Sequence, residues 1–144
     1  MLNVKNVAHY ILMQVGTITT VKLQRLVYYS QAWSLAWDGV PLFNEEFQAW
    51  ANGPVCAELF DAHRGQFLIS ADNLAAYSDY TLGPCEKETI DIVIESYNPY
   101  SSQELSDKTH HERPWKEARD GFAPGERCHN IISKETMQDY YAGL

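Results

Sequence analysis

The stretch from residue 19 to residue 39 constrains the fold most, because its pattern is helical and its apolar side chains lie on nearly all sides. These apolar residues form two sets: Leu23, Leu26, Val27, Trp33 and Trp37 on one side, and Tyr28, Ala32 and Leu35 on another. Thr19 or Thr20 is suited to cap the start, while Gly39 and the following Pro41 end the helix. A helix without a wide polar face must be surrounded by other elements. We therefore expect a central helix.

Shorter helical segments flank this central helix, and each has its own start and stop signals. Asn3 and Gly16 bracket an amphipathic stretch, and Gly53-Pro54 and Gly65 bracket another. Ser101 and Glu104 have the spacing of a capping box. Besides the central helix, these signals predict helices over residues 4–15, 54–64 and 84–97, from 101 on, over 114–120, and from 133 on.

Strand signals are few. Residues 43–50 alternate in the period of two that is typical of a strand, and residues 66–69 contain a brief apolar run. The segment 66–82 otherwise has no dominant period, so we expect a surface loop there. The predicted fold is mainly α: a single compact helical domain over residues 1–144, with about six helices and a small β element.

Charge and hydropathy exclude several classes of function. Nineteen acidic and eleven basic residues give a net charge of −8, which repels a phosphate backbone and disfavours nucleic-acid binding. Thirteen of the acidic residues lie in residues 73–144, so a basic partner protein or simply a solvated acidic surface fits that half. No apolar run approaches the roughly 18 residues needed to cross a bilayer. The polar residues mixed into residues 4–16 are unlike a secretory signal, so we expect a cytoplasmic protein.

A polar stripe interrupts the apolar surface of the central helix. Gln24, Tyr28 and Gln31 have the spacing i, i+4 and i+7, which places them on one helical face. They either offer amide and hydroxyl groups to a bound segment, or form a buried network that ties the helix to a neighbouring backbone. Lys22 and Arg25 flank the stripe in both interpretations.

Histidine and cysteine suggest metal chemistry only weakly. His110, His111 and Glu112 are consecutive, and Cys128 precedes His129. Adjacent histidines point in different directions on a helix or a strand, so they seldom bind one ion together. The sequence therefore predicts no metal site, and the three cysteines do not indicate a disulfide framework.

A nucleophilic site is also not indicated. Cys56 and His63 lie on the same face of a predicted helix but about 10 Å apart, which is too far for direct proton transfer. The chain contains no phosphate-binding glycine motif and no zinc-protease motif. We expect no catalytic residue and no cofactor.

The four tryptophans leave two interpretations open. Trp33, Trp37, Trp50 and Trp115 can supply the large apolar surface of the core. Alternatively, Trp50 or Trp115 lines a groove in which a partner docks, because tryptophan is enriched at the energetic centres of interfaces. Their exposure distinguishes the two.

Four ordered segments resemble a known family: residues 19–33 (TTVKLQRLVYYSQAW), 39–43 (GVPLF), 45–55 (EEFQAWANGPV) and 101–119 (SSQELSDKTHHERPWKEAR). Together they are similar to the Panacea domain, a family of small antitoxin-like and phage-associated proteins that includes the SocA-type proteolytic adaptor. The segment from Ile131 to Leu144 resembles the closing helix of that family.

The resemblance implies a mainly helical domain that binds a cognate toxin protein and neutralises it, without enzymatic activity. The shared positions it assigns, as fold or partner-binding candidates, are Lys22, Leu23, Gln24, Leu26, Tyr28, Tyr29, Gln31, Trp50, Gly53, Pro54, Val55, Leu105, Thr109, His110, Glu112, Pro114 and Trp115. Delivery of the toxin to an energy-dependent protease, and a phage or prophage accessory role without a toxin, are the alternatives. The sequence leaves open whether the chain forms a homo-oligomer.

Overall fold

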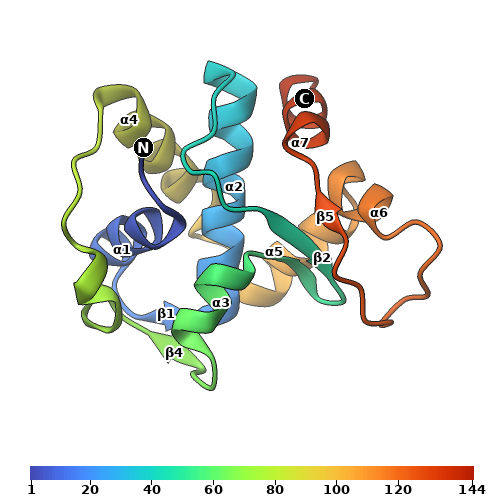
Figure 1. Ribbon diagram of the computed structural model, residues 1–144, viewed down its shortest axis with the longest axis horizontal. Coiled ribbons are helices and arrows are strands. Elements are labelled where there is room, and N and C mark those ends of the chain that lie inside the picture. Colours follow the sequence, from blue (N-terminus) through green and yellow to red (C-terminus); the bar gives the residue numbers. More distant parts are fainter.

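Helix α2 (Thr20–Asp38) runs through the middle of the molecule, and the other elements lie around it (Figure 1). The computed structural model describes all of residues 1–144. The other helices are α1 (Val4–Val15), α3 (Ala57–His63), the 3₁₀ helix η1 (Ala71–Tyr77), α4 (Pro84–Tyr97), α5 (Ser102–His110), α6 (Arg113–Ala118) and α7 (Lys134–Ala142). The strands are β1 (Ile18–Thr19), β2 (Phe47–Trp50), β3 (Gly53–Val55), β4 (Leu68–Ile69) and β5 (Ile131–Ile132). The mainly α prediction is confirmed, with eight helices where about six were expected.

The central position of α2 follows from its sequence as predicted. Thirteen of its nineteen side chains are buried. The hydroxyl of Thr19 accepts the backbone N–H of Lys22 at 3.1 Å, which caps the start. Gly39 adopts a left-handed conformation with φ of 70°, which ends the helix.

No helix of the chain combines the length and hydropathy required to cross a bilayer.

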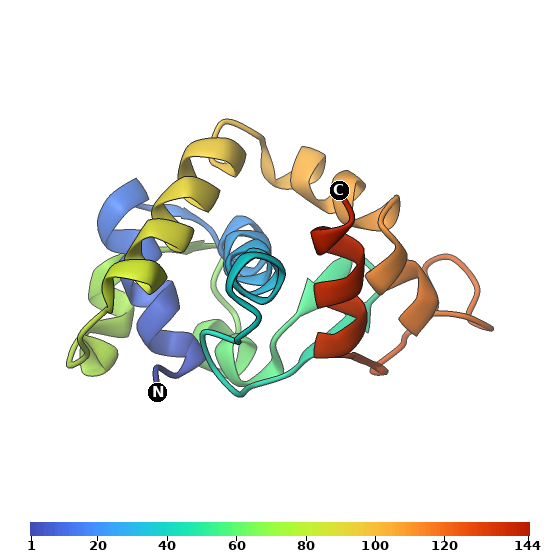
Figure 2. The ribbon, with the colours of Figure 1, turned by 90° about the horizontal axis from the view of Figure 1, so that it is seen from above.

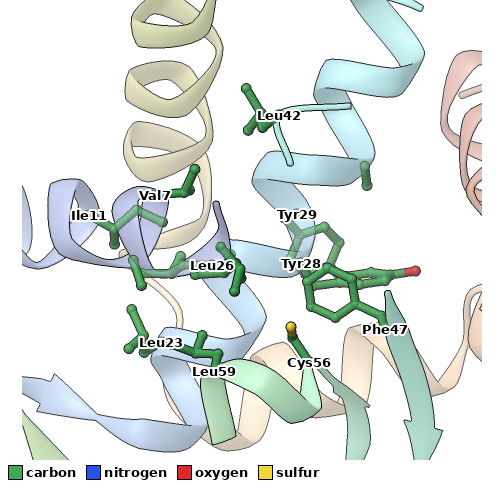
Figure 3. Packing of buried hydrophobic residues seen from close by; sticks show 14 of the residues in the cluster. Val7, Ile11, Leu23, Leu26, Tyr28, Tyr29, Leu42, Phe47, Cys56 and Leu59 are labelled. Atoms are coloured by element: carbon green, nitrogen blue, oxygen red, sulfur yellow. The ribbon is translucent and has the colours of Figure 1, made fainter. Parts of the chain in front are cut away.

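The core surrounds α2 on two sides. Seen along its axis, α1 and α4 lie on one side, and α7 and the small sheet lie on the other (Figure 2). Twenty-nine buried hydrophobic residues form one connected cluster. Figure 3 shows Val7 and Ile11 of α1 facing Leu26 of α2, while Tyr28 and Phe47 pack on the opposite side. One cluster therefore joins both halves through α2.

Two small antiparallel sheets complete the fold. Strand β1 pairs with β4, with Ile18 opposite Ile69. Strand β2 lies between β3 and β5, so the second sheet has the order β3-β2-β5. The predicted strands near 43–50 and 66–69 are therefore present in shortened form as β2 and β4. The ends of β2 and β4 depend on which residues of another strand they pair with, and residue alternation does not reveal these partners.

The segment after Gly53 corrects a prediction. We expected Pro54 to open a helix over residues 54–64, but Pro54 belongs to β3 and pairs with Ala49 of β2. Helix α3 begins only at Ala57, with Cys56 as its N-cap residue. Tertiary hydrogen bonds from α2 to the carbonyl oxygens of Pro54 and Cys56 favour the extended backbone here over the local helix signal. The expected loop over 66–82 likewise contains η1.

Gln31 holds the chain where it turns back after α2. Its amide nitrogen donates to the carbonyl of Phe43 at 2.9 Å, and its amide oxygen accepts the backbone N–H of Leu42 at 2.8 Å. All three residues are buried. One side chain thus satisfies two backbone groups that water cannot reach.

Replacing Gln31 with leucine should destabilise the fold by about 3 kcal/mol, because leucine fills a similar volume but leaves both backbone groups unpaired. Urea unfolding of the purified chain measures this change. The matched control is Gln14→Leu, at an exposed glutamine of α1, for which we expect a change of less than about 0.5 kcal/mol. Equal effects of the two substitutions would contradict the role of Gln31.

Candidate functional site

Two adjoining hollows open at the N-terminal end of α2. The first, which we call the Arg25 pocket, has a volume of about 380 Å³ and is lined by Thr20, Val21, Gln24, Arg25, Trp50, Ala51, Asn52, Val55, Phe60, His63, Gly125, Arg127, Cys128 and His129. The second, which we call the α5 groove, has a volume of about 300 Å³ and is lined by Thr19, Val21, Asn52, Phe67, Ser102, Gln103, Ser106 and His110. Because they share Val21 and Asn52, they form one continuous face.

Arg25 organises the floor of the pocket. Its guanidinium donates to the carbonyl of Pro54 at 2.6 Å, to the carbonyl of Asn52 at 2.8 Å, and to the hydroxyl of Ser106 at 3.3 Å. The residue is 2% exposed. One buried cation thereby ties α2 to the turn between β2 and β3 and to α5.

The turn passes so close to Arg25 that only glycine fits at position 53. A Cβ atom on Gly53 would lie 2.6 Å from Cζ of Arg25, well inside van der Waals contact. The backbone of Gly53 also has φ of 140°, which other residues rarely adopt. The predicted site residues Gly53 and Pro54 are therefore brought together with Arg25.

The pocket carries positive charge in an acidic protein. None of its fourteen lining residues is acidic, although the chain has nineteen acidic residues. Desolvation lowers the pKa of Arg25 to about 10, so the guanidinium stays charged at neutral pH. Arg127 and His129 are exposed at the rim. The electrostatic character of the pocket is thus opposite to that of the whole chain.

Gln24 fixes the wall formed by α3. Its side-chain oxygen accepts the N–H of Cys56 at 3.0 Å, so its nitrogen must be the donor to the carbonyl of Cys56 and to Nε2 of His63, at 3.2 and 3.1 Å. Nε2 of His63 is therefore an acceptor, which requires a neutral imidazole. Burial also lowers the pKa of His63 below 6.5.

The Cys56 thiol in this wall is not activated as a nucleophile. Burial raises the pKa of the Cys56 thiol to about 12, so the thiolate form that reacts is scarce at neutral pH. No group of three or more histidine, cysteine or acidic side chains is arranged to hold a metal ion.

Aromatic side chains from β2, from α3 and from the segment before β5 also line the pocket. Trp50 packs edge-to-face on Phe60, with ring centroids 5.0 Å apart, and His129 lies 5.6 Å from Trp50. Trp115 supports Trp50 by donating its indole N–H to the carbonyl of Trp50 at 2.8 Å. Of the two tryptophans considered for a groove, Trp50 lines the pocket, and Trp115 packs behind it.

The remaining candidates from the sequence divide between this face and other places. His110 lines the α5 groove and stacks on Trp115 at 4.3 Å, and its Nε2 atom is buried without a partner. Thr109 is buried and donates to the carbonyl of Ser106. Lys22 donates to the carbonyl of Asn98 on another side of α2. These side chains therefore do not form one site.

A separate buried cluster contains Tyr28 and Glu112. One carboxylate oxygen of Glu112 accepts the hydroxyls of Tyr29 and Tyr141, each at 2.8 Å. The hydroxyl of Tyr141 also lies 3.2 Å from that of Tyr28. Burial raises the pKa of Glu112. The polar stripe of α2 therefore does not point to one place, and both glutamines bind backbone groups, as in the structural interpretation.

Sequence reasoning missed the two arginines and the phenylalanine that shape the pocket. Arg25 was assigned only a flanking position, although a charged residue inside an otherwise apolar helix is a signal of a buried partner. Phe60 and Arg127 lie in segments that carry no motif. Only the fold brings residue 127 to the end of α2.

Comparison with known proteins identifies one family. The sequence model described as "Antitoxin SocA-like, Panacea domain" matches residues 23–116, which cover α2 from Leu23 onward and include β2, β3, α3, β4, η1, α4 and α5. No curated protein and no solved structure matches the chain. The matched range contains eight of the fourteen residues that line the Arg25 pocket. The six outside it are Thr20, Val21, Gly125, Arg127, Cys128 and His129.

Gly53→Ala should destabilise the protein by at least about 3 kcal/mol, because the new methyl group meets the buried guanidinium and the backbone is strained. Gly65→Ala is the matched control: its φ is 82°, but no atom lies within 4 Å of the added Cβ. We expect about 1 kcal/mol there. Urea unfolding of both variants measures the difference, and similar losses would show that the contact with Arg25 does not matter.

The neutral state of His63 predicts a dependence of stability on pH. Because the folded-state pKa lies below the unfolded value near 6.5, the stabilisation is complete above pH 6.5 and is lost as pH falls. Between pH 7.5 and pH 5, the wild type should lose more free energy of unfolding than His63→Gln, which retains every other titrating group. Parallel curves for the two proteins would refute this assignment.

Proposed function

We propose that this chain, which belongs to the SocA-like antitoxin family with the Panacea domain, neutralises a cognate toxin by direct protein–protein binding. The family membership carries the toxin–antitoxin role. The face formed by the Arg25 pocket and the α5 groove is the surface that we assign to the partner. In this role, residues 1–144 would act as one cytoplasmic binding domain without a cofactor.

Exposed apolar side chains support this choice of face. Phe67 is 75% exposed, Leu68 54% and Val21 40%. Val21 lines both hollows, and Phe67 lines the α5 groove. Apolar side chains gathered beside hollows mark interaction sites, because water at such a surface is released when a partner covers it. This cluster is the observation that carries the proposed mechanism.

The surrounding surface supplies the electrostatic part. The net charge of −8 attracts basic proteins over distances of about a Debye length. A toxin that acts on RNA or nucleotides exposes basic residues, which the acidic side chains outside the two hollows would attract. Covering the toxin's active site or its entrance requires an interface of roughly 800 Å² on each partner. Binding would then block the toxin without altering it chemically.

The first experiment is co-expression of the chain with the product of the adjacent reading frame, followed by size-exclusion chromatography. Restored growth together with a stable complex supports neutralisation by binding. Restored growth with loss of the toxin from the cell, measured as a shortened toxin half-life, indicates delivery to a protease instead. Absence of rescue removes the toxin–antitoxin assignment for that pair and leaves an accessory role.

Phe67→Ser should weaken the complex by at least about tenfold, because it removes an exposed aromatic side chain from the proposed interface. The matched control is Val40→Ser, since Val40 is 55% exposed and follows Asp38, the last residue of α2, at the opposite end of that helix. Dissociation constants from calorimetry on the purified pair measure both effects. If Val40→Ser weakens binding and Phe67→Ser does not, the interface has been placed at the wrong end of the molecule.

A further inference from the structure

We propose that the Arg25 pocket binds a small planar anion with the chemistry of a nucleoside monophosphate. The aromatic ring would pack against Trp50 and Phe60, and the phosphate would lie toward Arg25 and Arg127. The pocket belongs to the face that we assign to the toxin, but every residue of the ligand site comes from this chain.

The first argument is a buried cation without a counter-ion. Arg25 is 2% exposed, yet none of the ion pairs in the protein includes it. Its three recorded bonds go to two carbonyls and one hydroxyl, all of which are neutral. Buried charges in proteins are normally paired, because removing them from water is costly. An anion in the pocket supplies the missing opposite charge.

Arg25 also retains hydrogen-bonding capacity for such an anion. Each of its two terminal nitrogens carries two hydrogens, and each uses one on a backbone carbonyl. The remaining N–H groups are suited to oxygen atoms of phosphate, because the planar guanidinium matches the geometry of that group.

Several positive groups converge on the pocket, and negative groups avoid it. The first turn of α2 lines the pocket, contains no acidic residue, and carries the positive end of the helix dipole. Arg127 at the rim makes no recorded hydrogen bond or ion pair, whereas the neighbouring carboxylate of Glu126 accepts the N–H of Ala123. Glu58 accepts the thiol of Cys56 and does not line the pocket. The local charge thus favours an anion.

The walls determine that the anion should carry a flat ring. Trp50 is half-buried and lines the pocket together with Phe60, so an entering ring meets aromatic carbon. Stacking on tryptophan or phenylalanine tolerates different bases, because every base has a π face. Asn52 is exposed at the rim, and no hydrogen bond of its side-chain amide is recorded, which leaves it free to contact polar edges of the ring. A volume of about 380 Å³ lies within the range of ligand sites.

The test is calorimetric titration of the purified chain with AMP, GMP, CMP and UMP, and with adenosine and inorganic phosphate as partial ligands. We expect at least one nucleoside monophosphate to bind about tenfold or more tightly than adenosine and than inorganic phosphate, because only the whole molecule uses both the wall and the cations. Equal affinity for inorganic phosphate would overturn the planar-ligand proposal. Absence of binding by all four nucleotides would overturn the site.

A charge-matched pair of variants locates the binding. Arg127→Gln should lower the affinity for the nucleotide that binds by about tenfold, because it removes a cation at the rim. Lys116→Gln removes the same charge from the exposed surface of α6 and should leave the affinity unchanged. Equal losses would show that only net charge matters and would contradict the site. None of these measurements requires a toxin, so a negative result leaves the proposed function untouched.

Nuclear magnetic resonance provides a second, independent measurement. Upon addition of the nucleotide, the indole N–H signal of Trp50 and the Nε–H signal of Arg25 should shift. Trp33, at another position on α2, donates its indole N–H to the hydroxyl of Tyr97 in α4. The chemical shift of this N–H should not change. Shifts at Trp33 without shifts at Trp50 would overturn the assignment of the pocket.

Discussion

The buried guanidinium of Arg25 is the interaction on which the candidate face depends. A charge inside a protein must be compensated, and here the compensation comes from carbonyl groups of a turn and from a hydroxyl of α5. These groups must therefore remain where they are for as long as the arginine is buried. One side chain therefore fixes the hairpin between β2 and β3, the middle of α5 at Ser106, and the N-terminal part of α2 relative to one another. The rigidity of the pocket follows from this requirement.

Side-chain hydrogen bonds to the backbone of neighbouring segments recur along α2. Gln24 holds the backbone at Cys56, and Gln31 holds the backbone at Leu42 and Phe43. In each case a long polar side chain of the central helix satisfies main-chain groups of an irregular segment that packs against it. A helix that is apolar nearly all round needs such contacts, because neighbouring turns and loops bring polar backbone into the core. The polar residues of α2 therefore set the path of the chain around it.

Local patterns predicted the parts of this fold that depend on local physics. The caps at Asn3, Thr19, Ser101 and Ser133 and the central helix are present, because side-chain capping and apolar periodicity involve neighbouring residues. The extended conformation of Pro54 was not predictable, because it depends on Arg25 and Gln24 from a distant segment. For the site, the sequence offered Trp50 as one of two candidates to line a partner groove, and Trp50 lines the pocket, whereas Arg25 was given only a flanking place and Arg127 was missed. Charge compensation between distant segments has no sequence signature.

Strand β5 adds a constraint on the order in which the protein can assemble. It joins β2 from more than eighty residues further along the chain, and α7, which follows it, covers Tyr28 of α2. During synthesis on a ribosome, one edge of β2 and one side of the central helix therefore remain uncovered until β5 and α7 have been made. Contacts between such distant segments form slowly, and an unpaired strand edge is open to other chains in the meantime. A nascent chain halted before residue 131 would present these surfaces to chaperones and proteases.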